Sequence, residues 1–163
     1  MSDSILENKI EIWIKKFILK QKNYKLVDII KSEDLSKINN EHIKNFKSYS
    51  SWCFTPDFTV IIQNTSNEKF EIILINRTHK SVGLREIGEI MCFNRIINPT
   101  FSFLISRKGH SEEISFFMID DNFNKKLVNY NDKNLIIFAF NDDNENIRKE
   151  SIIPLACRRL LDE

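Results

Sequence analysis

The chain has little of the residues that most often mark linkers and crosslinks. It contains 3 Gly, 3 Pro and 3 Cys among 163 residues. So few glycines and prolines leave no candidate for a flexible linker or a low-complexity segment, and no internal repeat is visible. With 42% hydrophobic residues, a chain of this length can bury one sizeable core. We therefore expect a single domain over residues 1–163.

The cysteines suggest neither a disulfide framework nor a zinc site. Cys53, Cys92 and Cys157 are odd in number and far apart, and none has CxxC spacing. We interpret them as reduced core residues of an intracellular, cytoplasmic protein. An apolar run of about 18 residues is also missing, and Asp3 and Glu7 lie near the N-terminus, so neither membrane spanning nor export is expected.

A strong charge of one sign is lacking as well. The 24 basic and 23 acidic residues give a formal net charge of +1, which disfavours a globally basic protein that binds nucleic acid by bulk electrostatics. A local basic excess does occur between residues 76 and 110, where six basic residues face only two acidic ones. The basic residues are Arg77, Lys80, Arg85, Arg95, Arg107 and Lys108. Any nucleic-acid site is therefore predicted there.

Apolar residues recur at helical spacing near the N-terminus and predict a helix over residues 4–21. They are Leu6, Ile10, Trp13, Ile14, Phe17 and Ile18. Ser4 and Glu7 have the spacing of a capping box at its start. The other side carries Lys9, Lys15, Lys16 and Lys20, a stripe that could face phosphates but is more typical of a solvated helix face.

Two strong strand patterns, 58–63 and 70–75, flank the polar residues 64–69 and predict a hairpin. If the turn is centred on Ser66 and Asn67, Val60 pairs with Ile73, and the same register places Asp57 opposite Asn76. Apolar residues occupy both faces of each strand. We therefore expect this hairpin in the middle of a sheet that is covered on both sides.

The remaining patterns complete an α/β prediction. They indicate a strand at 24–30, a helical loop at 35–49, a helix at 82–97, and strands at 100–106 and 135–140. Residues 111–119 fit either a helix or a strand, and 152–161 fit a short terminal helix or a tail. The expected fold is a central mixed sheet, with a hairpin followed by a helix and a strand, flanked by helices.

This combination resembles the PD-(D/E)xK, or restriction-endonuclease-like, nuclease superfamily, and within it archaeal resolvase-type nucleases and their relatives. The resemblance covers about 50 of the 163 residues. It is carried by Thr55-Pro-Asp57-Phe58, residues 72–78, Gly83-Leu-Arg85-Glu-Ile-Gly88-Glu89 and Phe103-Leu-Ile-Ser106. It implies a restriction-endonuclease-like core. It also implies a divalent metal, Mg²⁺ or Mn²⁺, held by an Asp at the start of one strand and an acid late in the next, with a Lys two residues further on.

The chain departs from that pattern at two of these three positions. Asp57 takes the first position, but Asn76 falls at the second acid and Thr78 at the lysine. Because Asn contributes no negative charge, metal affinity should fall by at least roughly 10–100-fold. Glu7 or Glu11 resembles the additional acid that such nucleases often carry on their first helix.

A migrated catalytic site is the main alternative. Glu86 and Glu89 lie one turn apart on the predicted helix after the hairpin, where the superfamily sometimes relocates its acid. Asp57 and Glu86 would then hold the metal, and Lys80 would replace the lost lysine. In the competing interpretation, both glutamates are solvated or pair with nearby arginines.

The favoured function is a nuclease-fold protein that binds DNA with a weakened or lost catalytic site and needs no cofactor. Ser81-Val-Gly83, before the predicted helix, offers backbone N–H groups for a phosphate or forms an ordinary helix cap. One alternative is an active Mg²⁺- or Mn²⁺-dependent DNA endonuclease. Another is a protein–protein interaction domain of a DNA repair or processing assembly. A homodimer or a partner protein is compatible with each of these.

Overall fold

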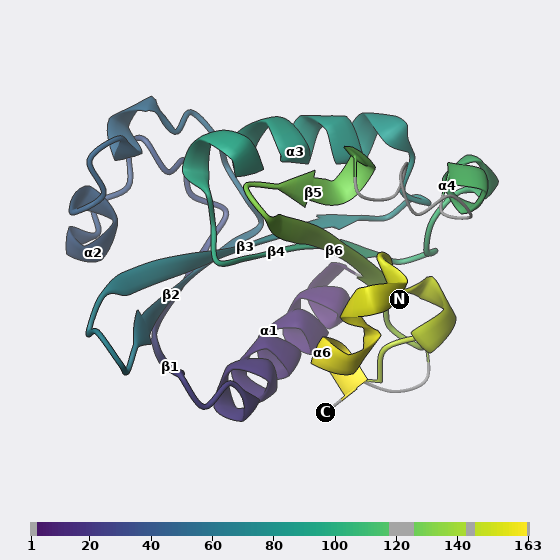
Figure 1. Cartoon of the computed structure of the whole chain (residues 1–163), viewed down its shortest axis with the longest axis horizontal. Helices are drawn as coiled ribbons and strands as arrows, with labels where there is room; N and C mark the ends of the chain where they lie inside the picture. The colour runs from purple at the N-terminus through teal and green to yellow at the C-terminus, as the bar shows by residue number, and fades with distance from the viewer. Residues whose placement is uncertain (1–2, 118–125, 143–145, 163) are drawn as a thin grey trace.

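The computed structural model describes residues 3–117, 126–142 and 146–162 and has an α/β architecture. Within these residues, an open, mixed sheet of six strands lies between helices, in the order β1-β2-β3-β4-β6-β5 (Figure 1). The strands are β1 (Tyr24–Lys31), β2 (Phe58–Asn64), β3 (Phe70–Thr78), β4 (Phe101–Ser106), β5 (Asn129–Tyr130) and β6 (Lys133–Ala139). The helices are α1 (Asp3–Lys20), α2 (Glu41–Lys44), α3 (Leu84–Ile97), α4 (Glu112–Phe117) and α6 (Arg158–Asp162). The expected α/β class, with a mixed sheet flanked by helices, is confirmed.

Strand direction divides the sheet into two halves. β1, β2 and β3 pair antiparallel, whereas β3, β4 and β6 pair parallel. α3 provides the crossover connection that two parallel strands require. The carboxyl ends of β3, β4 and β6, at Thr78, Ser106 and Ala139, therefore meet at one edge of the sheet, which we call the carboxyl edge.

The hairpin of β2 and β3 has the predicted register. Val60 pairs with Ile73. Ile61 and Ile62, which point to opposite faces, are both fully buried, so the hairpin is covered on both sides as expected. In the turn, the side chain of Asn64 accepts a hydrogen bond from the Ser66 N–H at 3.0 Å. Strand alternation and turn chemistry therefore specify the same pairing.

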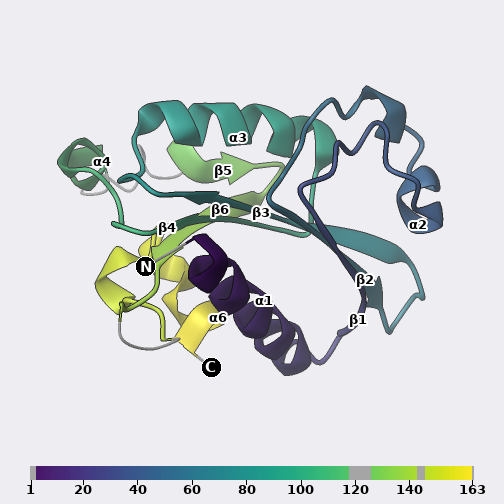
Figure 2. The same ribbon diagram turned by 180° about the vertical axis from the view of Figure 1, so that it is seen from behind.

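α1 covers one face of the sheet through a cluster of aromatic side chains. All six residues of its predicted apolar stripe are buried. The ring of Trp13 lies 5.0 Å from that of Phe103 and 4.8 Å from that of Phe138, measured between centroids. Phe17 adds a stacked contact to Trp13 at 5.4 Å. Each such burial contributes roughly 1.5–3 kcal/mol, so this cluster fixes α1 on the sheet. Figure 2 shows α1 and α6 together on this face.

α3 and the excursion over residues 32–57 cover the opposite face. Ile87 and Met91 of α3 pack in one cluster with Leu104 of β4. The excursion buries Trp52 in a neighbouring cluster, together with residues of β2 and β3. Both faces of the central strands are thus shielded from solvent, which explains why these strands read as continuous apolar runs.

The segments with weaker patterns are only partly regular. The expected helical loop at 35–49 contains the short α2, whose first N–H groups are capped by the side chain of Asn40. Residues 112–117 are helical, which decides between helix and strand there, while 118 and 119 lie outside the described residues. Residues 152–161 contain a 3-10 turn, η3 (Leu155–Cys157), and most of α6. A second 3-10 turn, η2 (Lys149–Ser151), precedes them, and a third, η1 (Tyr49–Ser51), lies in the excursion.

Two expectations about single residues are wrong. The cysteines are free, but Cys53 and Cys92 are exposed and do not belong to the core, whereas the half-buried Cys157 packs against it. Cys53 lies in the loop after η1, and Cys92 lies on the solvent side of α3. Ser4 is not the N-cap of the first helix, because α1 already includes Asp3.

Candidate functional site

The carboxyl edge gathers most of the residues singled out from the sequence. Ligands of open α/β sheets bind beyond the carboxyl ends of the strands. Arg77 and Thr78 end β3, and Asp57 precedes the antiparallel β2 beside them. Arg107 and Lys108 directly follow β4. Residues far apart in the sequence therefore lie at one edge.

Asp57 binds Arg77 through both of its carboxylate oxygens. The backbone N–H of Arg77 donates to Oδ2 at 2.8 Å, and its Nε donates to Oδ1, also at 2.8 Å. The two side chains are 26% and 18% exposed, so the pair is largely shielded from water. Charge-assisted bonds of this length belong to the strong class. The guanidinium therefore engages Asp57, a carboxylate that the sequence assigns to metal binding in both nuclease interpretations.

Asn76, the expected neighbour of Asp57, makes neither of these bonds. Its side chain is buried, and its Nδ2 is a donor without a partner among the described residues. Asp57 binds Arg77 and not Asn76 because of its position just before β2. Asp57 precedes Phe58, the first residue of β2, so strand alternation does not fix the direction of its side chain. Arg77 lies two residues after Ile75 in β3 and therefore on the same face, the one that α1 covers. The carboxylate of Asp57 binds it on that face.

Glu7 of α1 extends this arrangement. Nη1 of Arg77 lies 3.5 Å from Oε2 of Glu7 and donates to the backbone oxygen of Asp3 at 3.4 Å. A single guanidinium thus connects α1 to the start of β2. Of the two acids named on the first helix, Glu7 contacts Arg77, while Glu11 pairs with Lys15 and Lys31.

Lys31 of β1 continues the ion pairs along α1. Its Nζ lies 2.7 Å from Oε2 of Glu11 and 3.2 Å from Oε1 of Glu7. Lys15 donates to Glu11 at 2.7 Å. Hydrogen bonds from Lys15 and Lys31 lower the pKa of Glu11 from 4.5 to about 2. The bonds to Glu11 and Glu7 raise the pKa of Lys31. Charges of alternating sign therefore tie α1 to β1 and β3.

Glu86 closes the amino end of α3. Its Oε2 accepts the N–H of Gly83 at 3.0 Å, which satisfies one of the unpaired donors of the first turn. The N–H of Val82 donates to the carbonyl of Gly109 at 2.9 Å. Two of the three N–H groups predicted to receive a phosphate, in Ser81-Val-Gly83, therefore have partners inside the protein.

The acids of the migrated-site alternative lie on α3. Glu86 caps that helix, Glu89 is exposed on it, and Lys80 is exposed after β3. Within the described residues, no ion pair joins Lys80 to Asp57. The same part of the chain contains no group of three His, Cys, Asp or Glu side chains arranged to hold a metal ion.

Ser106 organises the loops at the carboxyl edge. Its Oγ accepts the N–H groups of Lys108 and Gly109 at 3.0 and 2.9 Å and donates to the carbonyl of Lys80 at 2.8 Å. The N–H of Lys80 donates to Oγ1 of Thr78 at 3.3 Å. Thr78, which takes the place of the nuclease lysine in the sequence resemblance, thus holds the loop that follows β3 through this hydrogen bond. Lys80 and Lys108 are presented from two loops that are tied together.

The six basic residues do not form one patch. Lys80 and Lys108 are exposed at the carboxyl edge, beside the half-buried Arg107. Arg85 is exposed in the first turn of α3. Arg95 is exposed near the other end of that helix, about 15 Å away at a rise of about 1.5 Å per residue. Arg77 is engaged by acids, so three cationic side chains of the predicted set, with Arg85 nearby, are available at the edge.

Arg148 is a cation at this edge that the sequence did not indicate. Its Nη2 donates to the carbonyl of Arg107 at 2.9 Å, and its N–H donates to the carbonyl of Ala139 at 2.7 Å. Arg148 lies in a polar, acidic stretch without a motif. The chain returns along the end of β6, which pairs with β4, and this arrangement brings Arg148 beside Arg107, so no local signal marks it.

Comparison with known protein families, curated proteins and solved structures found no match. Among the helices that the structure describes, none combines the length and the apolar composition needed to cross a bilayer.

Proposed function

We propose that the chain binds DNA through its carboxyl edge and does not cleave it. The Asp57–Arg77 pair carries this proposal. Arg77 places a permanent positive charge at hydrogen-bond distance from the carboxylate, where a metal-dependent enzyme would need a cation. The acid at the edge is thereby neutralised, and the phosphates of DNA meet mainly cations.

The bonds that these groups make support the proposed absence of cleavage. Hydrolysis assisted by Mg²⁺ requires carboxylate oxygens that bind the ion while it contacts the scissile phosphate. Both oxygens of Asp57 accept bonds from Arg77, and Glu86 caps α3. Displacing a bond to a charged group costs about 1.5–3 kcal/mol, which a metal would have to offset before it could bind.

We further propose that the core is restriction-endonuclease-like. The element order supports this: α1, then the antiparallel β1, β2 and β3, then the crossover helix α3 and the parallel β4. It brings Asp57 and the end of β3 to the same edge, as the resemblance in the sequence implies. The distribution of charge then favours binding over hydrolysis.

DNA binding at this edge would depend on phosphate contacts and not on base reading. Lys80 and Lys108 are exposed point charges on short, tied loops, and among the described residues no long helix or ribbon projects from the edge to enter a groove. With about three cations contacting phosphate, the logarithm of affinity should fall with the logarithm of salt with a slope of about −3.

The test is fluorescence anisotropy of a labelled DNA duplex across a series of NaCl concentrations. Lys108→Glu should weaken binding by on the order of tenfold at low salt and make the salt slope shallower by about 1 to 2. Lys47→Glu, an exposed site in the excursion 32–57, is the matched control and should bind like the parent.

Two results would overturn the proposal. Equal losses for Lys108→Glu and Lys47→Glu would remove the carboxyl edge as the binding surface. Specific cleavage of the duplex by the purified parent chain with Mg²⁺ or Mn²⁺, abolished by Asp57→Asn, would show that Arg77 does not block a metal.

A further inference from the structure

The solvent-facing side of α1 carries a row of exposed aliphatic side chains. Seven large hydrophobic residues are exposed among the described residues, and three of them, Ile5, Ile12 and Leu19, belong to this one helix. They are 48%, 40% and 84% exposed. The other four come from four different elements. Exposed apolar residues are therefore concentrated on α1, and we call Ile5, Ile12 and Leu19 the aliphatic row.

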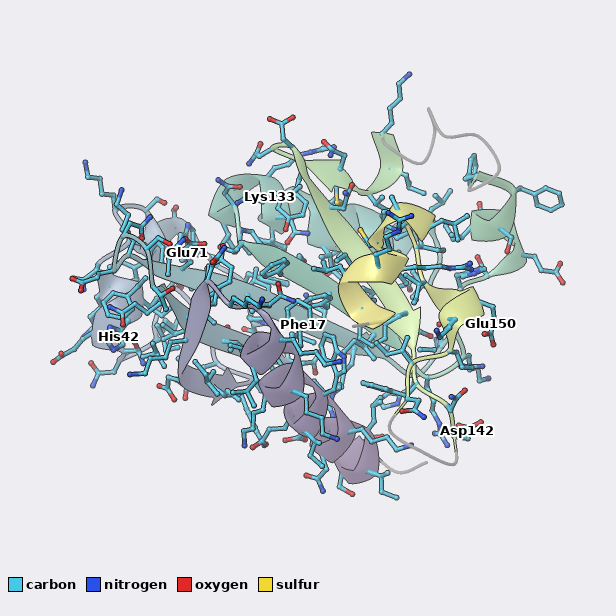
Figure 3. The ribbon with its side chains drawn as sticks, turned by 60° about the horizontal axis from the view of Figure 1, so that its bottom comes forward. Phe17, His42, Glu71, Lys133, Asp142 and Glu150 are labelled. Atoms are coloured by element: carbon cyan, nitrogen blue, oxygen red, sulfur yellow. The ribbon has the colours of Figure 1, made fainter. Side chains whose placement is uncertain are left out.

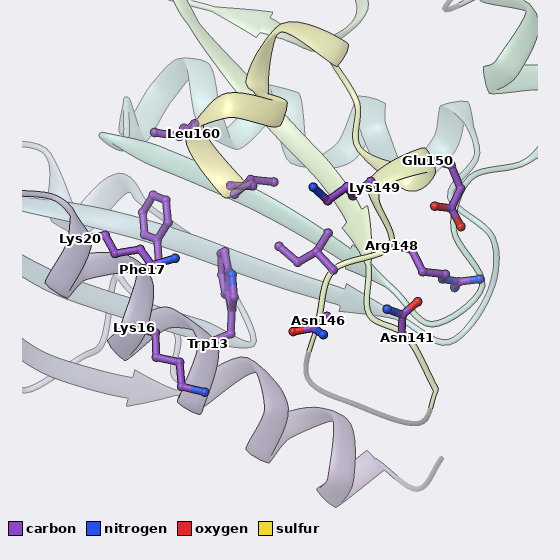
Figure 4. A pocket seen from close by; sticks show the side chains of 12 residues that line it. Trp13, Lys16, Phe17, Lys20, Asn141, Asn146, Arg148, Lys149, Glu150 and Leu160 are labelled. Carbon is purple, nitrogen blue, oxygen red and sulfur yellow. The ribbon is translucent and has the colours of Figure 1, made fainter. Parts of the chain in front are cut away.

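The members of the aliphatic row are aligned along the helix axis. Each follows the previous one by seven residues, which is close to two turns and about 10.5 Å of helix. The buried side of α1 faces the sheet, and Figure 4, a close view of the pocket beside this helix, shows Trp13 and Phe17 pointing from α1 into the protein. Figure 3, which brings α1 forward, shows no other described helix or strand over its outer side. The row is thus a continuous line that faces solvent.

The charged residues on the outer side of α1 are lysines. After the first turn, the exposed residues of the helix include Lys15, Lys16 and Lys20 but no acid, and Lys22 is exposed just beyond the helix. Lys15 is paired with Glu11, and Lys16 also has a partner, so only Lys20 and Lys22 are counted below as ligand-binding cations. Exposed lysines without exposed acids give this side a positive potential, which favours an anionic partner.

The spacing of the aliphatic row disfavours another helix as its partner. Two helices that pack along a seam need apolar residues at two positions of every seven, whereas this row supplies one. The residues three positions after its first two members are Asn8 and Lys15, and those four positions after them are Lys9 and Lys16. A second copy of α1 would also bring lysines opposite lysines, and like charges repel. A partner helix, including that of a second copy, is therefore a poor fit.

A planar lipid surface fits the same row. A helix that lies on a plane touches it along a line, so a single row of aliphatic side chains is sufficient to enter the boundary between headgroups and acyl chains. Lysines beside such a row keep their stems in the apolar layer while their charged ends reach the headgroups.

We propose that the outer side of α1 binds the surface of a membrane that contains negatively charged phospholipids. The aliphatic row enters the apolar layer, and Lys20 and Lys22, next to Leu19 in the sequence, bind headgroup phosphates. This surface uses none of the cations of the carboxyl edge. Its binding to lipid therefore does not depend on the DNA binding proposed for that edge.

Sedimentation of lipid vesicles with the purified chain measures this binding. One kind of vesicle contains phosphatidylserine and phosphatidylcholine in equal parts, and the other contains phosphatidylcholine alone. Leu19→Ser and Ile96→Ser form a matched pair, because both remove an exposed aliphatic side chain, but Ile96 lies on α3 across the sheet from α1. Leu19→Ser should weaken binding to the anionic vesicles by on the order of tenfold, and Ile96→Ser by less than about twofold.

Lys22→Gln and Lys47→Gln test the contribution of charge. Lys47 is exposed in the excursion 32–57, on the face opposite to α1. One lysine near an anionic membrane changes the affinity about fivefold, so Lys22→Gln should lose that factor and Lys47→Gln should bind like the parent. Far-UV circular dichroism establishes that the variants are folded. If Leu19→Ser does not fold, Ile5→Ser serves in its place.

Each result decides the proposal. Saturable binding to the anionic vesicles that Leu19→Ser and Lys22→Gln weaken, and their controls do not, supports it. No binding to either kind of vesicle overturns it, as do equal binding to both kinds or equal losses in Leu19→Ser and Ile96→Ser. A loss in Lys22→Gln alone also overturns it, because the row would then not enter the lipid. A dimer in analytical ultracentrifugation that Leu19→Ser dissociates would assign the row to a second copy instead.

Discussion

Asp57 and Arg77 are brought together by two different features of the backbone. The register of β2 and β3 places the start of one strand beside the end of the other, and this register was predictable from two apolar runs and one polar turn. The partner of Asp57 was not predictable in the same way. Residues outside a strand do not obey its alternation, so the expected partner Asn76 is replaced by Arg77.

Replacing Arg77 should destabilise the fold because it leaves Asp57 partly buried without its cation. We expect Arg77→Met to lower the free energy of unfolding by about 2 kcal/mol, the typical cost of losing a bond to a charged partner. Urea unfolding followed by circular dichroism measures this quantity.

A double-mutant cycle separates the pair from the loss of packing. Arg77→Met combined with Asp57→Asn should lose less than the sum of the two single variants, by about 1 kcal/mol, because no unpaired carboxylate remains. Strict additivity would indicate that the two side chains do not interact in solution.

At the scale of elements, a strong apolar periodicity is sufficient to predict a helix or a hairpin from the sequence, and a weak one is not. α1, the β2–β3 hairpin and α3 were predicted because each buries a regular stripe of large side chains. The region 35–49 also buries large side chains, such as Leu35 and Ile43, but only Glu41–Lys44 of it is α-helical. Its order depends on contacts with distant strands, in a cluster that also contains Trp52. The sequence alone therefore could not specify its shape.

The cap of α3 gives a test that distinguishes Glu86 from Glu89. Glu86→Ala should lower the free energy of unfolding by about 1 kcal/mol, because the Gly83 N–H loses its acceptor. Glu89→Ala, on the exposed side of the same helix, should stay within about 0.3 kcal/mol of the parent. Thermal and urea unfolding of the two variants compare them directly. Equal effects would mean that the cap contributes nothing.

At the scale of the whole molecule, the basic residues show what a linear pattern misses. Residues 76–110 look like one basic stretch, but α3 carries Arg95 away from the carboxyl edge. β6, from the last third of the chain, brings Arg148 to it. Lys80, Arg107 and Lys108 could thus be found from the sequence. The place of Arg148 depends on strand order, which no local pattern encodes.

The ties between α1 and the sheet should make the stability of the whole chain depend on acidity. The folded-state pKa of Glu11 is about 2, below its ordinary value of 4.5, because Lys15 and Lys31 bind it. Its stabilising contribution is therefore complete above about pH 4.5 and is lost as the pH falls toward 2. Glu11→Gln should be less stable than the parent at neutral pH, and the difference should shrink between these two values. Urea midpoints over this range measure it, and a constant difference would contradict the assignment.

The guanidinium between Asp57 and Glu7 also determines how the molecule responds to its surroundings. A bound ion can be stripped by a chelator, replaced by a competing metal or lost on dilution. An arginine side chain is attached covalently and keeps its charge at every pH that a cell experiences. The acids at this edge therefore have a counter-ion of constant occupancy, and their neutralisation does not vary with the supply of metal.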